Sequence, residues 1–338
     1  MKLIFKQDEV LTDNHGRIIN YARLAVTDRC NLRCSYCMPE QGLDWLSRNE
    51  LMNNAELLHI SRLLVHMGIR KIRITGGEPF VRKDMMPLLQ DLSQLPGLEE
   101  LTITTNGVLT APLIPDLKKM GVRSVNLSLD SLDRERFFSI TRRDEFPAVW
   151  DTLEQLLRHD MEVKINTVVM TQRNIADLVP LAMLTKELPV SVRFIEEMPF
   201  NGEGHSFSGA LWNEQQIHAH LLTAFPGMYK IPDPPYATAH HYQVPGHRGT
   251  IGIIAAYTRN FCGSCNRLRI TPQGMLKTCL YDGGVLNIRD LLRKEETDDS
   301  IREKILGRLG QRAKDGWEAE KNIRHTALQH ESMASIGG

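Results

Sequence analysis

Between about residues 20 and 200, short runs of β-branched and other apolar residues alternate with longer stretches whose apolar positions recur at helical spacing. Six runs have the length and composition of buried strands: Ala22–Thr27, Lys71–Thr75, Leu101–Thr105, Val125–Leu129, Val163–Met170 and Val192–Ile195. Five helical stretches separate them: Asn54–Met67, Asp84–Leu92, a segment that ends at Met120 before Gly121, Asp133–His159 and Ala176–Lys186. Strands that alternate with helices predict parallel βαβ units with right-handed crossovers.

The six predicted units fit either an open, doubly wound sheet or an incomplete barrel, and periodicity does not choose between them. Beyond them, residues 201–249 contain several Gly and Pro residues and are predicted to be loop-like. We expect a domain boundary here, with a first domain at residues 15–235 and a second at 236–338. The second domain holds a short apolar run, Ile251–Tyr257, and a charged helical tail.

The chain of 338 residues carries no net charge, because 41 Lys and Arg residues balance 41 Asp and Glu residues. Non-specific binding to nucleic acid needs a surplus of positive charge, so the composition argues against a nucleic-acid partner. An anionic ligand would need a local cluster of basic residues. No apolar run approaches the ~18 residues of a membrane span and no signal peptide is evident, so we expect a cytoplasmic protein with no membrane partner.

Six cysteines form two groups of three that lie more than two hundred residues apart. The first group, Cys30, Cys34 and Cys37, has the spacing C-x3-C-x2-C directly after the first predicted strand. Soft thiolate ligands select zinc or iron–sulfur clusters. A structural zinc site needs a fourth ligand, and no His or fourth Cys lies in this loop. The spacing therefore favours a cluster of four irons, in which three cysteines leave one iron open for a small molecule.

This triplet, with Tyr36 before its last cysteine, resembles the signature of the radical S-adenosylmethionine enzymes. Gly76-Gly77-Glu78-Pro79, after the second predicted strand, resembles the GGEP motif of the same family. Two glycines in such a turn allow the backbone to approach a ligand closely. The resemblance implies that the open iron chelates the amino and carboxylate groups of S-adenosylmethionine, and that one electron cleaves this cofactor to a 5′-deoxyadenosyl radical.

Residues with polar or sulfur-bearing side chains gather where the predicted strands end. They are Thr104, Thr105 and Asn106 after the third strand, Ser128 and Asp130 after the fourth, and Glu196 and Met198 after the sixth. Cys30 and Gly76 follow the first two strands in the same way. The active site of a parallel barrel lies at the carboxyl ends of its strands, so we expect these residues to surround one site.

The second group of cysteines has the spacing C-x2-C-x13-C and consists of Cys262, Cys265 and Cys279. Zinc is one interpretation of this site, with a fourth ligand from His240, His241 or His247. The pattern also resembles the auxiliary cluster of the GTP 3′,8-cyclase family, whose open iron binds the guanine base. This family carries a Gly-Gly tail that reaches into the active-site pocket, and the present chain ends in Gly337-Gly338.

The resemblance implies roles for individual residues. Those expected to contact S-adenosylmethionine are Tyr36, Gly77, Ser128 and Met198. Those expected to bind GTP are Arg23, Arg73, Thr104, Lys164, Arg267, Leu268 and Arg269. Those expected to be catalytic are Arg23, Arg73, Gly337 and Gly338.

The basic residues of this set also have a physical rationale. Arg23, Arg73 and Lys164 lie within predicted strands, where a charged side chain must face a polar interior or pair with a carboxylate. Arg267 and Arg269 share one face if their segment is a strand, and their planar guanidinium groups suit a triphosphate. The alternative for these two is pairing with Asp282 or Asp290.

We therefore predict an α/β fold, a partial (β/α)6 TIM-like barrel with a smaller C-terminal iron–sulfur domain that closes the open side. The resemblance implies cyclisation of GTP to (8S)-3′,8-cyclo-7,8-dihydroguanosine 5′-triphosphate, the first step of molybdenum cofactor biosynthesis. The implied cofactors are two 4Fe–4S clusters and S-adenosylmethionine. The implied partners are GTP, an electron donor (flavodoxin-like or a chemical reductant) and a downstream cyclic pyranopterin monophosphate synthase, with a homodimer as one option.

Two alternatives stay open. One is a radical S-adenosylmethionine enzyme that modifies a peptide and carries an auxiliary cluster, and the other is a non-enzymatic zinc-binding protein. His159-Asp160 departs from the family, in which we expect a glycine-containing turn at this place. This departure puts one loop in doubt but none of the chemistry.

Overall fold

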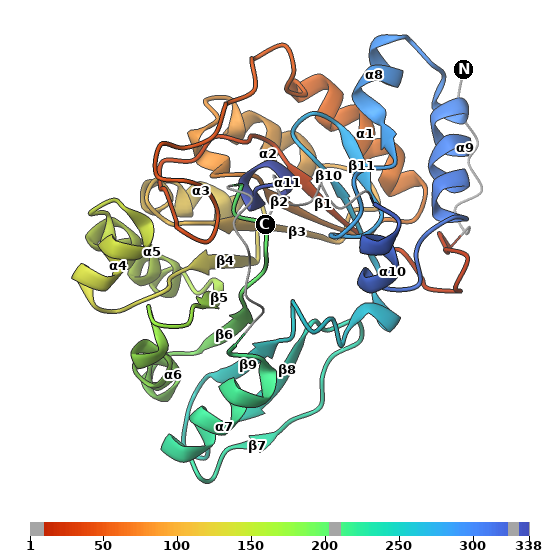
Figure 1. Ribbon diagram of the computed structural model, residues 1–338. Helices are drawn as coiled ribbons and strands as arrows, with labels where there is room; N and C mark the ends of the chain where they lie inside the picture. Colours follow the sequence, from red (N-terminus) through yellow and green to blue (C-terminus); the bar gives the residue numbers. More distant parts are fainter. Residues whose placement is uncertain (1–9, 203–210, 324–330, 338) are drawn as a thin grey trace.

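The computed structural model describes residues 10–202, 211–323 and 331–337 (Figure 1). Within them, six consecutive strands form parallel pairs: β1 (Tyr21–Ala25), β2 (Lys71–Thr75), β3 (Glu100–Thr105), β4 (Ser124–Ser128), β5 (Glu162–Val169) and β6 (Val190–Glu196). Each of the six predicted strands is present, with ends that differ by at most two residues.

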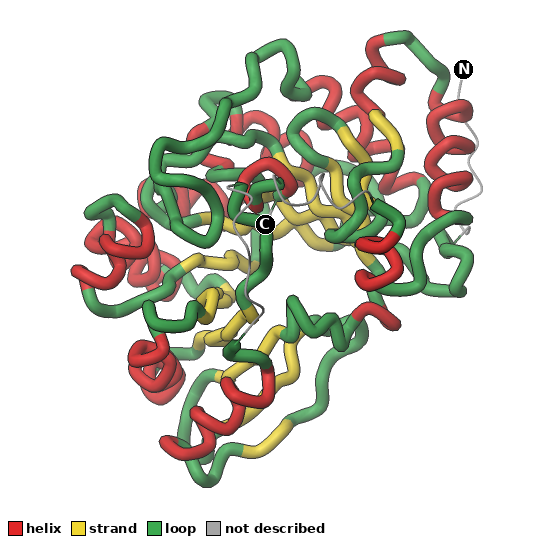
Figure 2. The backbone as a smooth tube through the Cα atoms, in the orientation of Figure 1, coloured by secondary structure: helices red, strands yellow, loops and turns green. Residues whose placement is uncertain are grey.

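Helices separate these strands as the periodicity predicted. They are α1 (Asn54–His66), α2 (Met85–Ser93), α3 (Ile114–Lys119), α4 (Arg134–Thr141), α5 (Phe146–Arg158) and α6 (Leu178–Glu187), with short 3-10 turns at Pro79–Val81, Ala111–Leu113 and Ile175–Asp177. Asn53 begins α1 through a capping box with Glu56, so the first turn has partners for its free N–H groups. Figure 2 shows these helices outside the curved sheet.

The core lies between the sheet and its helices. Alternate residues of a strand point to opposite faces, so Ile72 and Ile74 of β2 are fully buried on the helix side. Lys71, Arg73 and Thr75 then point to the inner face. This alternation delivers polar side chains to the interior of the curved sheet while the outer face packs against helices.

Strands from the C-terminal third extend both edges of the six-stranded sheet. β10 (Arg267–Ile270) pairs in parallel with β1, and β9 (Thr250–Ile254) pairs in parallel with β6. Antiparallel strands follow on each side: β11 (Met275–Lys277) and β12 (Leu286–Asn287) beyond β10, and β8 (Ala239–Gln243) and β7 (Tyr229–Lys230) beyond β9. From β1 to β6 each strand pairs with the next one in the chain, without the reversal of order that marks a doubly wound sheet, and the order ends at β12 and β7 without closing. This confirms a partial barrel.

The prediction of a loop over residues 201–249 is wrong in part. The segment contains α7 (Glu214–Ala224), whose N-cap Asn213 accepts hydrogen bonds from two backbone N–H groups, and the strands β7 and β8. The prolines that suggested a loop, Pro226, Pro232, Pro234 and Pro235, lie between these elements. Because the sheet is continuous from β6 to β7 through β9 and β8, the boundary at residues 235 and 236 stays a prediction.

The charged tail is helical, as predicted. It forms α8 (Ile288–Arg293), α9 (Asp298–Leu309), α10 (Gly316–Lys321) and α11 (Met333–Ile336), and Cys262–Ser264 forms a 3-10 turn. None of the helices described is long and apolar enough to cross a membrane. At the turn after α5, Asp160 adopts the left-handed conformation (φ 50°) that a glycine would take, a conformation that Asp tolerates better than most residues.

Candidate active site

The register of three adjacent strands places basic side chains in two rows on the inner face. Arg23 of β1 is level with Arg269 of β10 and Arg73 of β2. Tyr21, two residues earlier on the same face, is level with Arg267 and Lys71. Parallel pairing without a register shift therefore gathers five cations around one tyrosine.

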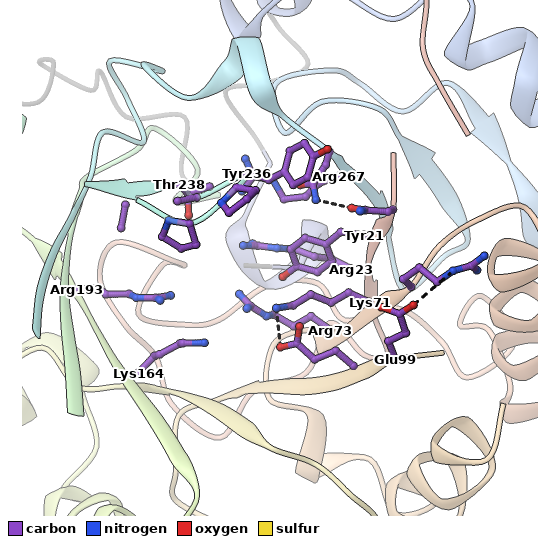
Figure 3. A pocket seen from close by; sticks show the side chains of 18 of the residues that line it. Tyr21, Arg23, Lys71, Arg73, Glu99, Lys164, Arg193, Tyr236, Thr238 and Arg267 are labelled. Carbon is purple, nitrogen blue, oxygen red and sulfur yellow. Dashed lines mark hydrogen bonds and ion pairs between the residues drawn. The ribbon is translucent and has the colours of Figure 1, made fainter. Parts of the chain in front are cut away.

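Side chains from both rows line a cavity of about 360 Å³, which we call the cation cavity (Figure 3). The basic side chains that line it are Arg23, Arg70, Lys71, Arg73, Lys164, Arg193 and Arg267. Three cations have carboxylate partners: Lys71 with Glu100 at 2.7 Å, Lys164 with Glu162 at 2.6 Å and Arg70 with Glu99 at 3.9 Å. Across the described part of the chain, Arg23, Arg73, Arg193 and Arg267 form no ion pair with a carboxylate.

The buried positive charges of the cation cavity would be stabilised by a bound anion. Burial, together with neighbouring positive charges, lowers the pKa of Arg23 to about 10 and also lowers the pKa of Arg73 and Arg193. Burial would raise the pKa of the Tyr21 phenol, but the surrounding positive charges lower it to about 8. The Nε atoms of Arg23 and Arg193 are buried without a hydrogen-bond partner. A polyanion would satisfy these donors and offset the repulsion.

The sequence predicts four of the seven basic residues that line the cation cavity. Arg23, Arg73, Lys164 and Arg267 lie together here as expected, whereas Tyr21, Lys71 and Arg193 were not singled out. The sequence carries a signal for two of the three basic residues that it did not predict, Lys71 and Arg193, but not for Arg70. Arg193 lies in the middle of β6 and Lys71 shares a face with Arg73, so the rule that a charged strand residue must face a polar interior applies to both.

A second cavity, of about 170 Å³, contains the first three cysteines, and we call it the first cysteine cavity. Its lining includes all four residues expected to contact S-adenosylmethionine, Tyr36, Gly77, Ser128 and Met198. Thr104, expected to bind GTP, also lies here rather than in the cation cavity. The polar strand-end residues Thr105, Asn106, Asp130 and Glu196 also line this cavity, as expected for residues that surround one site.

The two cavities lie on one face of the sheet. On β5, Lys164 lines the cation cavity and Asn166 lines the first cysteine cavity, and residues two apart on a strand share a face. Glu100 and Thr104 of β3 repeat this arrangement. The first cysteine cavity is therefore the one nearer the carboxyl ends of the strands, where barrel active sites lie.

Two buried carboxyl groups form hydrogen bonds with residues that line the first cysteine cavity. The Tyr36 hydroxyl donates to Asp130 over 2.9 Å, and burial raises the pKa of Asp130 to about 6. Glu78 accepts hydrogen bonds from the Thr105 hydroxyl at 2.9 Å and from the Asn106 N–H at 2.7 Å, and burial raises its pKa to about 7. Burial also raises the pKa of Cys30 to about 11 and that of Cys37 to about 12, so a bound cation would be needed to favour the thiolates.

The two glycines of the GGEP motif make room for the chain itself. A Cβ atom on Gly76 would lie 2.5 Å from the Thr27 carbonyl oxygen, and one on Gly77 would lie 2.3 Å from the Arg29 carbonyl oxygen. We expected close approach to a ligand, and the described contacts are instead with the backbone that leads into Cys30. The motif thus packs the turn after β2 directly against the first cysteine loop.

A third cavity, of about 60 Å³, is lined by the second group of cysteines, and we call it the second cysteine cavity. Arg267 lines both this cavity and the cation cavity. Arg269 lies next to Arg23 in the register but lines the second cysteine cavity and not the cation cavity, and it donates to the Gly337 carbonyl. Its expected role in binding GTP stays a prediction. The Leu268 side chain is fully buried in the core and lines none of the three cavities.

The predicted C-terminal tail lies against the barrel strands. A Cβ atom on Gly337 would lie 2.7 Å from Thr75 Oγ1 and 2.8 Å from Ala25 Cβ, at the ends of β2 and β1. Gly338 lies outside the described residues. The alternative partners of the two arginines are engaged elsewhere, because Asp290 pairs with Arg289 and Asp282 accepts from backbone N–H groups near Cys279.

The histidines do not supply a fourth ligand to the second cysteines. His240 and His241 lie on β8 and contact Asp233 at 3.1 and 3.0 Å, and His247 contacts the Thr185 hydroxyl at 2.8 Å. Among the described residues, no three or more His, Cys, Asp and Glu side chains form a group that could hold a single metal ion. A cluster makes a different demand, because each thiolate binds its own iron and the three sulfurs need not converge.

Two family models match consecutive parts of the chain. The radical SAM superfamily matches residues 24–184, and the family described as Molybdenum Cofactor Synthesis C matches residues 190–317. The chain is 38% identical over 331 residues to GTP 3′,8-cyclase of Chlorobaculum tepidum, covering 97% of both chains. It is 36% identical to the mitochondrial GTP 3′,8-cyclase of Arabidopsis thaliana, over 98% of this chain and 84% of that one.

Animal relatives are longer. Molybdenum cofactor biosynthesis protein 1 of Drosophila melanogaster is 37% identical over 93% of this chain, which spans 55% of that protein, so the chain covers about half of such relatives. Among solved structures, Streptococcus suis SuiB bound to S-adenosylmethionine has a TM-score of 0.57 at 15% identity, over 79% of this chain and 62% of that one. The structure of anSMEcpe with AdoMet and a peptide has a TM-score of 0.54 at 17% identity, over 92% and 87% of the two chains. At these identities the likeness is one of fold.

Proposed function

Because the chain belongs to the GTP 3′,8-cyclase family, we propose that it cyclises GTP to (8S)-3′,8-cyclo-7,8-dihydroguanosine 5′-triphosphate in the first step of molybdenum cofactor biosynthesis. The observation that supports this most directly is the stacking of two cavities on one sheet face. One is lined by three free thiols, and the other by cations of which four have no carboxylate partner within the described ranges. A radical cofactor needs the cavity with thiols, and a nucleoside triphosphate needs the cavity with cations.

The thiols fit the expected clusters. Cys30, Cys34 and Cys37 would hold a first 4Fe–4S cluster, and Cys262, Cys265 and Cys279 would hold a second. All six are free soft donors, and each group lines one cavity. When bound, the first cluster and S-adenosylmethionine supply the radical chemistry, while the chain supplies binding and orientation.

The cation cavity would fix the triphosphate. Arg23, Arg73 and Arg193 would donate charge-assisted hydrogen bonds to phosphate oxygens. With the phosphates held at the level of Lys164, the ribose would point along β5 toward Asn166 and the first cysteine cavity. Arg267 would join the triphosphate to the second cysteine cavity, where the base would bind.

Other residues would hold the cofactor and the tail. Tyr36, Gly77, Ser128 and Met198 would contact S-adenosylmethionine, because all four line the first cysteine cavity. Arg269 would fix Gly337 at the ends of β1 and β2 and thereby keep the tail inside the barrel.

The peptide-modifying alternative fits less well. A peptide substrate gives no reason for seven basic side chains around a cavity of about 360 Å³, whereas a triphosphate does. Within residues 10–202, 211–323 and 331–337 the zinc alternative finds no fourth ligand, since His240, His241 and His247 have other partners.

The test is anaerobic incubation of the iron-loaded protein with GTP, S-adenosylmethionine and a reductant. We expect 5′-deoxyadenosine and a cyclised nucleotide in equal amounts, from a protein that holds about eight irons per chain. Stoichiometric zinc without iron, or cofactor cleavage that does not depend on GTP and yields no cyclised nucleotide, would contradict the proposal.

The reaction needs an electron from outside the chain, which we propose is delivered by a flavodoxin-like protein or, in the test tube, by a chemical reductant. A cavity of about 670 Å³, which we call the basic groove, lies behind the first cysteine loop. Its basic lining residues are Arg29, Arg48, Arg82, Lys83 and Arg293, against the acids Glu56 and Asp84. Arg29, Arg48 and Lys83 are exposed and form no ion pair in the part of the chain that the structure describes.

Arg29 links this groove to the first cysteine loop. Its carbonyl accepts from the Glu78 N–H at 2.8 Å on the inner side, its side chain is exposed, and Cys30 follows it directly. An acidic surface on a donor protein would match the groove's excess of positive charge. We also propose that the product passes to a cyclic pyranopterin monophosphate synthase, that the chain works in the cytoplasm, where its thiols stay reduced, and that it forms a homodimer.

A further inference from the structure

A buried network of two arginines and one aspartate lies beside the second cysteines. Arg17 Nε donates to Asp13 Oδ2 over 2.6 Å, and a terminal nitrogen of Arg312 donates to the same oxygen over 3.0 Å. The three side chains are 7%, 0% and 2% exposed for Arg17, Asp13 and Arg312. Asp13 and Arg17 precede β1, whereas Arg312 follows α9, so the network joins the two ends of the chain.

The network holds the backbone at each cysteine of the second group. Arg17 donates to the Cys262 carbonyl over 3.1 Å, and Arg312 donates to the Cys265 carbonyl over 3.1 Å. Arg312 Nε also donates over 2.9 Å to the carbonyl of Thr278, the residue before Cys279. Two side chains therefore fix both chain segments that bring the three thiols to one cavity.

Arg312 also reaches a thiol directly. One of its terminal nitrogens lies 3.1 Å from Cys265 Sγ and donates to it. The network contains two guanidinium groups and one carboxylate, so it carries one unbalanced positive charge. Burial of such a charge is costly unless something nearby is negative. A thiolate that binds iron supplies that negative charge.

A purely structural role explains less of this arrangement. Well-packed apolar side chains would hold two loops together at no electrostatic cost, and buried ion networks add little net stability compared with them. None of the described contacts of Arg312 goes to the first cysteine group. The network is therefore specific to one set of thiols.

We propose that Arg312, held by Asp13 and Arg17, is a positioning residue for the second iron–sulfur cluster and sets its reduction potential through Cys265. Hydrogen bonds and positive charge at a ligand sulfur stabilise the reduced cluster and raise its potential. Arg312 also orders the cysteine segments before iron arrives, because its bonds to backbone carbonyls need no metal. The inference rests on the proposed function only as far as the second cluster, and not on the GTP reaction.

The test compares Arg312→Gln and Arg312→Lys with Arg293→Gln in the full chain. Arg293 is the control, because it also pairs with a carboxylate (Glu56, 2.6 Å) and donates to loop carbonyls, those of Asn49 and Leu51, but has no described contact with the second group of cysteines. In the iron-free protein, we expect Arg312→Gln to speed alkylation of Cys262 and Cys279 about tenfold, since a buried bond to a charged group is lost and their backbone loosens. Cys265 is left out of this comparison, because it also loses the donor that favours its thiolate. Alkylation of Cys30, Cys34 and Cys37 provides an internal reference that stays constant.

The iron-loaded protein gives the second measurement. We expect the potential of the second cluster to fall in Arg312→Gln, to shift less in Arg312→Lys, which keeps the charge, and to stay unchanged in Arg293→Gln. The first cluster should keep its potential in all three variants. An unchanged second potential, or faster alkylation of both cysteine groups alike, would overturn the proposal and leave Arg312 as a general folding contact. Failure of GTP turnover in the wild-type chain would overturn the proposed function without affecting either measurement.

Discussion

At the scale of single residues, the cation cavity is held in an unfavourable state until an anion enters. Arg23, Arg73, Arg193 and Arg267 lack carboxylate partners among the described residues. Burial, together with the neighbouring positive charges of Arg73 and Arg267, lowers the pKa of Arg23. A ligand that binds only the folded chain stabilises it by mass action. Bound triphosphate should therefore raise the free energy of unfolding as well as serve as the reactive part of the substrate, and each of these residues should contribute its own contact.

Arg267→Ala is expected to weaken GTP binding roughly 10- to 100-fold, because a charge-assisted bond to phosphate is lost. Iron content should not change, since the guanidinium packs on the Phe261 ring at 4.9 Å and lines the cavities without being a ligand. Anaerobic titration calorimetry and iron analysis measure the two effects. Arg134→Ala, which removes an exposed pair with Asp144, is the control. Equal loss of iron and of GTP binding would make Arg267 a structural residue.

Tyr21→Phe is expected to weaken binding of inorganic triphosphate about tenfold and to remove part of its pH dependence. The buried Tyr21 hydroxyl has no hydrogen-bond partner of good geometry, and its ring lies 5.3 to 5.9 Å from the Lys71, Arg73 and Arg23 cations. Because the phenol pKa is about 8, the wild-type site gains a negative charge as the pH rises through that value. A bound anion favours the neutral phenol, so wild-type affinity should fall over this window.

Calorimetry from about pH 7 to about pH 9 measures this effect, and the phenylalanine variant should lack the step near pH 8. Lys71→Met serves as a comparison, because it removes a charge and leaves the phenol in place. The same step in wild type and Tyr21→Phe would show that another group titrates.

The sequence predicts the chemistry of single residues better than their partners. Arg23, Arg73 and Lys164 were recognised because a charge within a strand demands a polar surrounding. Arg269 has the same signal, yet its partner is the Gly337 carbonyl, 68 positions away. Such a contact depends on where the tail folds back, and no local pattern encodes this.

At the scale of elements, the six parallel strands follow from local periodicity, whereas the strands at the two edges do not. β10 has only four residues and pairs with β1, which lies more than two hundred residues earlier. α7 was missed because Gly and Pro residues surround it, although Asn213 is a good N-cap signal. Short edge elements are defined by pairing with a distant partner, and single-sequence patterns carry little of that information.

The tail helix α11 is an element that exists only through its contacts. Its four residues are too few to be helical alone. Three described bonds hold it: the Ser332 hydroxyl donates to the Cys37 carbonyl at 2.6 Å, the Met333 N–H donates to the Phe200 carbonyl at 3.0 Å, and Arg269 donates to Gly337. The tail is thus coupled to the first cysteine loop.

Gly337→Ala is expected to displace this tail, because its φ of 78° is strained for alanine and the new Cβ would lie 2.7 Å from Thr75 Oγ1. We expect turnover to fall at least about fivefold, in line with a local cost of about 1 kcal/mol or more. Unfolding midpoints and iron content should stay close to wild type. Gly307→Ala, whose Cβ would have no neighbour within 4 Å, is the control. Full activity of Gly337→Ala would show that the tail takes no part in the reaction.

At the scale of the whole molecule, zero net charge conceals an uneven distribution. The cation cavity lies inside the barrel, and the basic groove lies behind the first cysteine loop. The groove has five basic and two acidic lining residues in a chain whose total charge is zero. Local charge of one sign speeds the encounter with an oppositely charged partner more than it increases affinity. Such a surface suits a transient donor that binds, transfers an electron and leaves.

Reversal of two charges in the groove, Arg48→Glu with Lys83→Glu, should slow reduction of the first cluster by an acidic flavodoxin roughly tenfold or more at low ionic strength. Reduction by dithionite should keep its rate, because a small reductant needs no docking surface. The difference between the variants should shrink as salt rises to about 0.5 M, where exposed charges are screened within a few ångströms. Lys119→Glu with Lys186→Glu changes the net charge equally on α3 and α6 and should leave both rates unchanged. If reduction by flavodoxin and by dithionite slowed equally, the groove residues would support the cluster loop instead of a docking surface. If both double variants slowed reduction by flavodoxin equally, only the total charge of the chain would matter.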